Sequence, residues 1–123
     1  MKRIALILLF TLPVIFICPA QENHSLYSIK QFIVLYTLGK NWDASKPAGE
    51  QAYFSEHSAH LAKLRKEKKI RIGARYGDTG MIVLRAGTEE EARGWVEADP
   101  AIQNKLFKVE LFEMSPFYHG CID

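Results

Sequence analysis

A histidine and an aspartate far apart in this 123-residue chain could together carry acid–base chemistry. His57 lies one helical turn before Leu61 and two turns before Leu64, so it shares the apolar face of a predicted helix. Imidazole takes and releases protons near neutral pH, as general acid or base catalysis requires. Asp99 follows a second predicted helix and could accept the imidazole N–H, which would fix the tautomer. For each residue the alternative is structural: a half-buried histidine bonded to backbone, and an Asp-Pro pair that ends a helix.

A pair of histidines raises a second possibility, a metal site. His57 and His60 are three residues apart, a spacing that suits two ligands on one helical face. The candidates for a third ligand are Glu56, Asp99 and His119. Because the chain contains no His-Glu-x-x-His motif, we predict neither a metal nor any other cofactor.

The composition and charge of the chain limit the kinds of molecule that we expect it to bind. Lys and Arg number 16 and Asp and Glu 14, but two of the cations are Lys2 and Arg3, so the chain after residue 20 is formally neutral. A neutral body gives no reason to expect a nucleic acid or an acidic membrane as partner, and we predict no nucleic-acid binding. Within the one basic cluster, at 63–75, Arg75 is distinct. Its guanidinium stands in a glycine-rich turn, where it could bind a carboxylate through two hydrogen bonds.

Residues 1–20 have the layout of a secretory signal peptide: a basic start, an uncharged apolar run, and the small residue Ala20 before the expected cleavage. The run is short for a transmembrane helix and contains Pro13. We therefore predict an exported protein, periplasmic or secreted, with no stable membrane association once the leader is removed. The alternatives are a lipid on Cys18 and an uncleaved membrane anchor. Cleavage would leave Cys121 as the single cysteine, which cannot form an internal disulfide.

The remaining chain alternates between strand and helix patterns. After a flexible lead-in at 21–30, we expect strands at 31–38, 70–72, 81–84 and 107–112, helices at 50–69 and 88–98, and a turn at 73–80. The order βαββαβ predicts an α+β, ferredoxin-like fold, in which an antiparallel four-stranded sheet carries two helices on one face. Apolar residues remain for the other face, so we expect a second copy to cover it in a homodimer.

The pattern over residues 31–117 resembles the YciI-related domain family. The matching segments are FIVLYT, EHSAHLAKL, IRIGARYGDTGMIVL and EEEARGWVEADPAI. The resemblance implies a YciI-like domain at 31–118, a short C-terminal tail at 119–123 and a dimeric α/β barrel. It also implies a characteristic aspartate, which maps onto Asp99, and a histidine on the first helix. Counting back from Gly73 selects His57 as that histidine, whereas matching the His-Leu pair selects His60. Lys68 departs from the family, which usually has glycine there.

The resemblance and the residues together predict an exported small-molecule enzyme of unknown substrate. His57 and Asp99 are its predicted catalytic residues, used for elimination, isomerisation or lactone-type chemistry on a small, anionic molecule. Arg75, Tyr76 and His60 are the predicted substrate-binding residues. The alternative is a non-catalytic dimeric module that binds a small ligand, or an accessory subunit that docks through the exposed aromatic tail of Phe117 and Tyr118.

Overall fold

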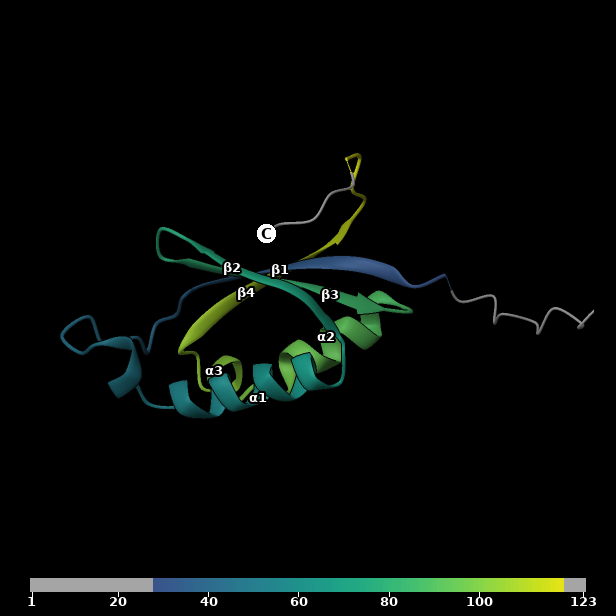
Figure 1. Cartoon of the computed structure of the whole chain (residues 1–123). Helices are drawn as coiled ribbons and strands as arrows, with labels where there is room; N and C mark the ends of the chain where they lie inside the picture. Colours follow the sequence, from purple (N-terminus) through teal and green to yellow (C-terminus); the bar gives the residue numbers. More distant parts are fainter. Residues whose placement is uncertain (1–27, 119–123) are drawn as a thin grey trace, which may run out of the picture.

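Residues 28–118 form a four-stranded antiparallel sheet with all of its helices on one face, in a computed structural model of the chain (Figure 1). The elements are β1 (Lys30–Leu38), the 3₁₀ turn η1 (Ala48–Glu50), α1 (Phe54–Lys66), β2 (Ile70–Tyr76), β3 (Thr79–Ala86), α2 (Glu89–Glu97), α3 (Pro100–Gln103) and β4 (Phe107–Met114). The structure describes these residues and not 1–27 or 119–123. The leader, most of the lead-in, the C-terminal tail and His119 therefore lie outside the described residues, and export stays a prediction.

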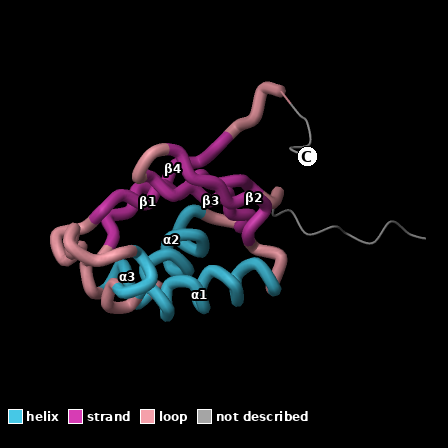
Figure 2. Tube along the Cα trace, turned by 60° about the vertical axis from the view of Figure 1, so that its left-hand side comes forward, coloured by secondary structure: helices cyan, strands magenta, loops and turns pink. Residues whose placement is uncertain are grey.

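The strand order β2-β3-β1-β4, with every pair antiparallel, confirms the predicted ferredoxin-like fold. Figure 2 shows the two layers, with the sheet above and the helices below. Alternation along β1 explains the layering, because Phe32, Val34 and Tyr36 are buried against the helices while Ile33 and Leu35 lie on the opposite face. Among residues 28–118, no helix is long and apolar enough to cross a bilayer.

The hairpin between β2 and β3 is tighter than expected. The sequence pattern predicts a turn across 73–80, but β2 continues to Tyr76 and β3 begins at Thr79, so only Gly77 and Asp78 connect them. Gly77 has a φ of 53°, a conformation that glycine adopts without steric cost. Gly73 and Gly80 belong to the paired strands instead of the turn. The glycines of this segment therefore have two roles. Gly77 forms the tight turn, and Gly73 and Gly80 are strand positions that carry no side chain.

The two long helices are defined by their ends. α1 is shorter than the predicted 50–69, and its exit places Lys68 at a φ of 59°, where the resemblance expects glycine. α2 begins with a capping box: the Thr88 hydroxyl accepts from the Glu91 N–H, and the Glu91 carboxylate accepts from the Gly87 N–H. The chain then turns at Asp99, because a residue that precedes proline avoids the helical region.

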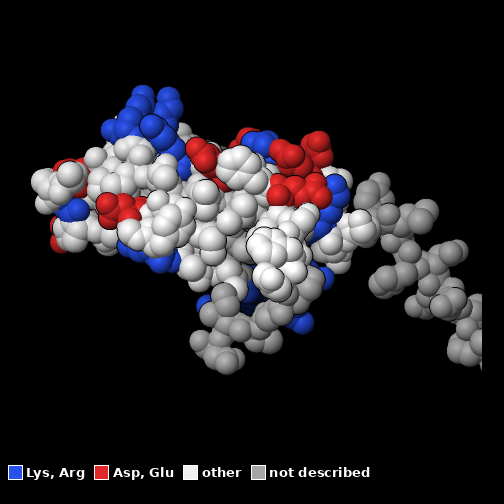
Figure 3. Space-filling model, turned by 90° about the horizontal axis from the view of Figure 1, so that it is seen from above, with Lys and Arg blue, Asp and Glu red and all other residues white. Residues whose placement is uncertain are grey.

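The face of the sheet away from the helices is largely apolar. Side chains on that face by strand register are Ile33, Leu35, Ile72, Met81, Val83, Phe112 and Met114. Seen from that side, uncharged residues occupy the centre and Lys, Arg, Asp and Glu gather toward the edges (Figure 3). Phe112 is 52% exposed, which is unusual for a phenylalanine within a sheet. The homodimer predicted from the sequence would bury this face.

Candidate active site

A cavity of about 510 Å³ lies between the sheet and the start of α1. Its wall includes Tyr36 of β1, Trp42 of the following loop, Phe54 and His57 of α1, Gly73 and Arg75 of β2, Gly80 of β3 and Phe107 of β4. The two glycines help to make the hollow, because a strand position without a side chain leaves room beneath the sheet. A Cβ added to Gly80 would lie 3.6 Å from the Tyr36 Cβ, an ordinary contact, so a larger side chain there would fill the cavity.

His57 and Asp99 meet beside this cavity. The His57 Nδ1–H donates to Asp99 Oδ2 at 2.5 Å, and the second carboxylate oxygen accepts from the Ala101 N–H at 2.9 Å. Asp99 is completely buried, and His57 is 8% exposed. The carboxylate caps the N-terminus of α3 and also accepts from the imidazole, so these two hydrogen bonds fix its orientation. The His57 ring lines the cavity, and with Nδ1 occupied the nitrogen available to a ligand is Nε2.

Aromatic rings surround the imidazole. The centroids of Phe107 and Tyr36 lie 4.9 and 5.3 Å from the centroid of His57, and that of Phe54 lies 6.2 Å away. Trp42 packs against Phe107 at 5.7 Å and extends the same wall. These rings exclude water from one side of the imidazole, and a low local dielectric strengthens its interaction with the carboxylate. The sequence analysis did not select any of the four aromatic residues, although the inward alternation of β1 could have indicated Tyr36.

The Tyr36 hydroxyl is the one buried side-chain polar atom that finds no hydrogen-bond partner within residues 28–118. Tyr36 is only 5% exposed, and its ring forms part of the cavity wall. Burial, and to a smaller extent the negative charge of Asp99, raises the pKa of the Tyr36 phenol well above its ordinary value. The phenol is therefore held in its protonated form, as a hydrogen-bond donor without an acceptor.

Replacing Tyr36 with phenylalanine is expected to increase the free energy of unfolding by about 1–3 kcal/mol, since it removes a buried unpaired hydroxyl and keeps the ring. The wild-type protein should also lose stability as the pH rises above about 10, because the unfolded phenol releases its proton there while the folded one keeps it. Urea unfolding at pH 7 and pH 10.5 measures both effects. If the variant is less stable at pH 7, the hydroxyl has a partner in solution.

The three predicted substrate-binding residues are placed differently. A register shift in β2 between Ile70 and Ile72 moves Arg75 to the helix side, opposite Gly80, and Arg75 lines the cavity. Tyr76 consequently lies on the other face of the sheet and is 55% exposed. The His60 Nε2–H donates to the Trp95 carbonyl oxygen at 2.8 Å. Neither Tyr76 nor His60 lines this cavity.

The two histidines of α1 therefore have different neighbours. A separation of three residues rotates a side chain by about 60° around a helix, which turns His60 toward α2 while His57 faces Asp99. This geometry makes His57 the histidine that pairs with the aspartate of the Ala-Asp-Pro segment. Within residues 28–118, no three His, Cys, Asp or Glu side chains are grouped so that they could hold a metal ion. The arrangement of His57 and His60 with His119 lies partly outside the described residues.

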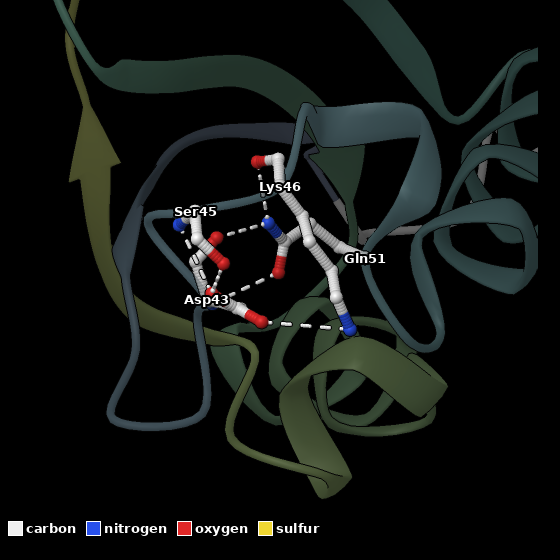
Figure 4. A network of polar contacts seen from close by, with 4 residues as sticks. All are labelled: Asp43, Ser45, Lys46 and Gln51. Atoms are coloured by element: carbon white, nitrogen blue, oxygen red, sulfur yellow. Dashed lines mark hydrogen bonds and ion pairs between the residues drawn. The ribbon is translucent and has the colours of Figure 1, made fainter.

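The loop that carries Trp42 is held by one buried amide (Figure 4). The Gln51 Nε2–H₂ group donates to the carbonyl oxygens of Asp43 and Lys46, at 2.6 and 3.0 Å, and Gln51 Oε1 accepts from the Asp43 N–H. Hydrogen bonds from the Ser45 hydroxyl and N–H hold the pKa of the Asp43 carboxyl below its usual range. This network gives the cavity a defined outer wall, which the sequence analysis did not foresee because its partners lie in an irregular loop.

Comparisons with known proteins found one similar solved structure and no matching family. No protein-family model matches the chain, and no curated protein is significantly similar to it. One solved structure to which the chain is similar is 5-chloro-2-hydroxyhydroquinone dehydrochlorinase from Burkholderia phenoliruptrix AC1100 in complex with 2,5-dihydroxybenzoquinone. It has a TM-score of 0.45 and 22% identity, over 72% of this chain and 95% of that chain.

Proposed function

We propose that the protein is a small-molecule enzyme in which His57 moves a proton to or from a substrate bound in the cavity. The observation that carries this proposal is the 2.5 Å hydrogen bond from His57 Nδ1 to a completely buried Asp99, at a ring that lines the cavity. An imidazole that only supported the fold would have no need of an open space beside its second nitrogen.

The geometry supports a division of roles among three residues. His57 Nε2 would take a proton from the substrate or return one to it. Asp99 would act through His57, holding the tautomer with hydrogen on Nδ1 and stabilising the imidazolium that forms. Arg75 has no ion-pair partner within residues 28–118, and would attract an anionic group to the mouth of the cavity. The resemblance to the YciI-related family implies the same histidine–aspartate pair.

The alternative is a module that binds a small ligand without converting it. Deuterium exchange distinguishes the two, because a general base exchanges an acidic C–H with solvent even when no net reaction follows. We would incubate the protein in D₂O with a panel of cyclic ketones, lactones and 2-oxo acids, and follow deuterium uptake by ¹H NMR. Wild-type exchange that disappears in both His57→Asn and the cavity-filling Gly80→Val supports the proposal. A compound that binds but exchanges equally in wild type and His57→Asn contradicts it.

We further propose that two copies associate through the apolar face of the sheet. An exposed phenylalanine of this face, on the edge strand β4, offers the sharpest test: Phe112→Glu places a charge in the interface and is expected to turn a dimer into a monomer. Light scattering after size exclusion gives the molar mass. The control is Lys66→Glu, a charge change at the exposed end of α1 on the helix side. A monomeric wild type, or a Phe112→Glu variant that remains dimeric, would disprove this interface.

A further inference from the structure

We infer that Tyr36 is a third catalytic residue, whose hydroxyl donates a hydrogen bond to the oxyanion that forms when His57 removes a proton from carbon. The inference deepens the proposed function and rests on it. It also narrows the substrate to a carbonyl compound with an acidic C–H next to its C=O group, such as a ketone or a lactone.

The first support is the unsatisfied hydroxyl. Buried polar groups are almost always paired, so a buried donor without an acceptor needs a physical explanation. The Tyr36 hydroxyl has no partner within residues 28–118, while phenylalanine would keep the ring contacts with His57 and Phe107. A donor of this kind is accounted for if its acceptor is a substrate atom. Tyr36 is one of the residues that line the cavity, so a substrate bound there can lie against this side chain.

The second support is the position of Tyr36 relative to the base. The Tyr36 and His57 rings meet edge to face with centroids 5.3 Å apart, so one small molecule can contact both side chains. Removal of a C–H proton next to a carbonyl develops negative charge on the carbonyl oxygen, which needs a donor close to the base. Arg75 serves this purpose less well, because it is exposed at the edge strand β2.

The step is balanced without any other reagent. The proton moves from the substrate carbon to His57 Nε2, and the electron pair of the C–H bond forms a C=C bond while the carbonyl oxygen becomes the oxyanion. The Tyr36 phenol keeps its proton throughout, as its raised pKa favours, and only donates a hydrogen bond. Return of the proton from His57 to a different carbon gives an isomer, and loss of a leaving group from the neighbouring carbon gives an elimination product.

Binding of phenolates tests this role independently of turnover, since a phenolate places a stable oxyanion where the enolate would form. We would titrate wild type, Tyr36→Phe and Tyr53→Phe with 4-nitrophenolate, and with nitrobenzene as a probe that lacks the oxyanion. Tyr53 is 44% exposed and does not line the cavity, so its variant is a matched control. We expect Tyr36→Phe to weaken 4-nitrophenolate binding about 10- to 100-fold and to leave nitrobenzene binding unchanged, with Tyr53→Phe binding both as wild type does.

Catalysis supplies the second readout. Exchange or turnover of a carbonyl substrate should fall about 100- to 1,000-fold in Tyr36→Phe, mainly in kcat, because the oxyanion exists only in the transition state and the intermediate. Equal 4-nitrophenolate binding by wild type and Tyr36→Phe, or no binding by either, overturns the role of Tyr36. Neither result contradicts the proposed function, which is contradicted only if His57→Asn keeps full activity. Phenolate binding that depends on Tyr36, together with an unaffected His57→Asn, would instead leave an oxyanion-binding protein without the proposed catalysis.

Discussion

Replacing His57 with alanine is expected to lower the free energy of unfolding by about 3–5 kcal/mol, the usual cost of leaving a buried charge without its partner. Asp99 is completely buried, and after the substitution its only hydrogen bond within the described chain would come from the Ala101 N–H. The carboxylate cannot move to solvent, because it also begins α3. Urea unfolding at pH 7, followed by circular dichroism, measures the loss.

The matched control is His57→Asn, whose amide nitrogen occupies nearly the position of the imidazole Nδ1. Asparagine can donate to Asp99 Oδ2, so this variant should keep most of the stability that alanine loses. Equal losses in the two variants would mean that packing against Phe107 and Tyr36, and not the hydrogen bond, is what His57 contributes to the fold. A loss below about 1 kcal/mol in His57→Ala would mean that the carboxylate is not buried as a charge.

The second large effect is on rate. Asp99→Asn is expected to slow proton exchange or turnover about 100- to 10,000-fold while the fold remains stable. The asparagine oxygen can still accept from the Ala101 N–H and begin α3. Its amide N–H₂ group then faces His57 Nδ1 and donates to it, which moves the ring proton to Nε2. An imidazole that carries its proton on Nε2 cannot act as a base toward the cavity.

Asp99→Ser separates orientation from capping. Serine also begins helices well, so α3 should form, but its short side chain does not reach the imidazole. We expect the free ring to change between tautomers, with a smaller rate loss than in Asp99→Asn and a pH–rate profile displaced from that of the wild type. ¹⁵N NMR of the labelled imidazole reports directly which nitrogen carries hydrogen. If Asp99→Asn retains wild-type rates with hydrogen on Nε2, Asp99 does not position a base.

Local patterns were sufficient for most of the fold. The patterns that predict a strand at 31–38 and a helix at 88–98 act over a few residues, and the structure has both elements, as β1 and α2. The βαββαβ order then allows few compact arrangements, because sheets and amphipathic helices must bury their apolar faces against each other. The Asp-Pro pair likewise marks the end of α2 through a steric effect on one residue.

The composition of the site depended on longer-range geometry. The distance in sequence between His57 and Asp99 says nothing of their separation in space, and the 2.5 Å hydrogen bond exists because α1 and the start of α3 pack on the same face of the sheet. One irregular step in β2 decided that Arg75 and not Tyr76 faces the cavity.

The three-residue spacing of His57 and His60 places both on one face of the predicted helix. It did not show that His57 contacts Asp99 while His60 contacts α2. The amino-acid order therefore specified which residue types were present and the periods of the strands and helices. Which residues meet at the cavity depends on the direction of each side chain. A shift of one residue in a strand reverses that direction, and the packing of a helix selects it.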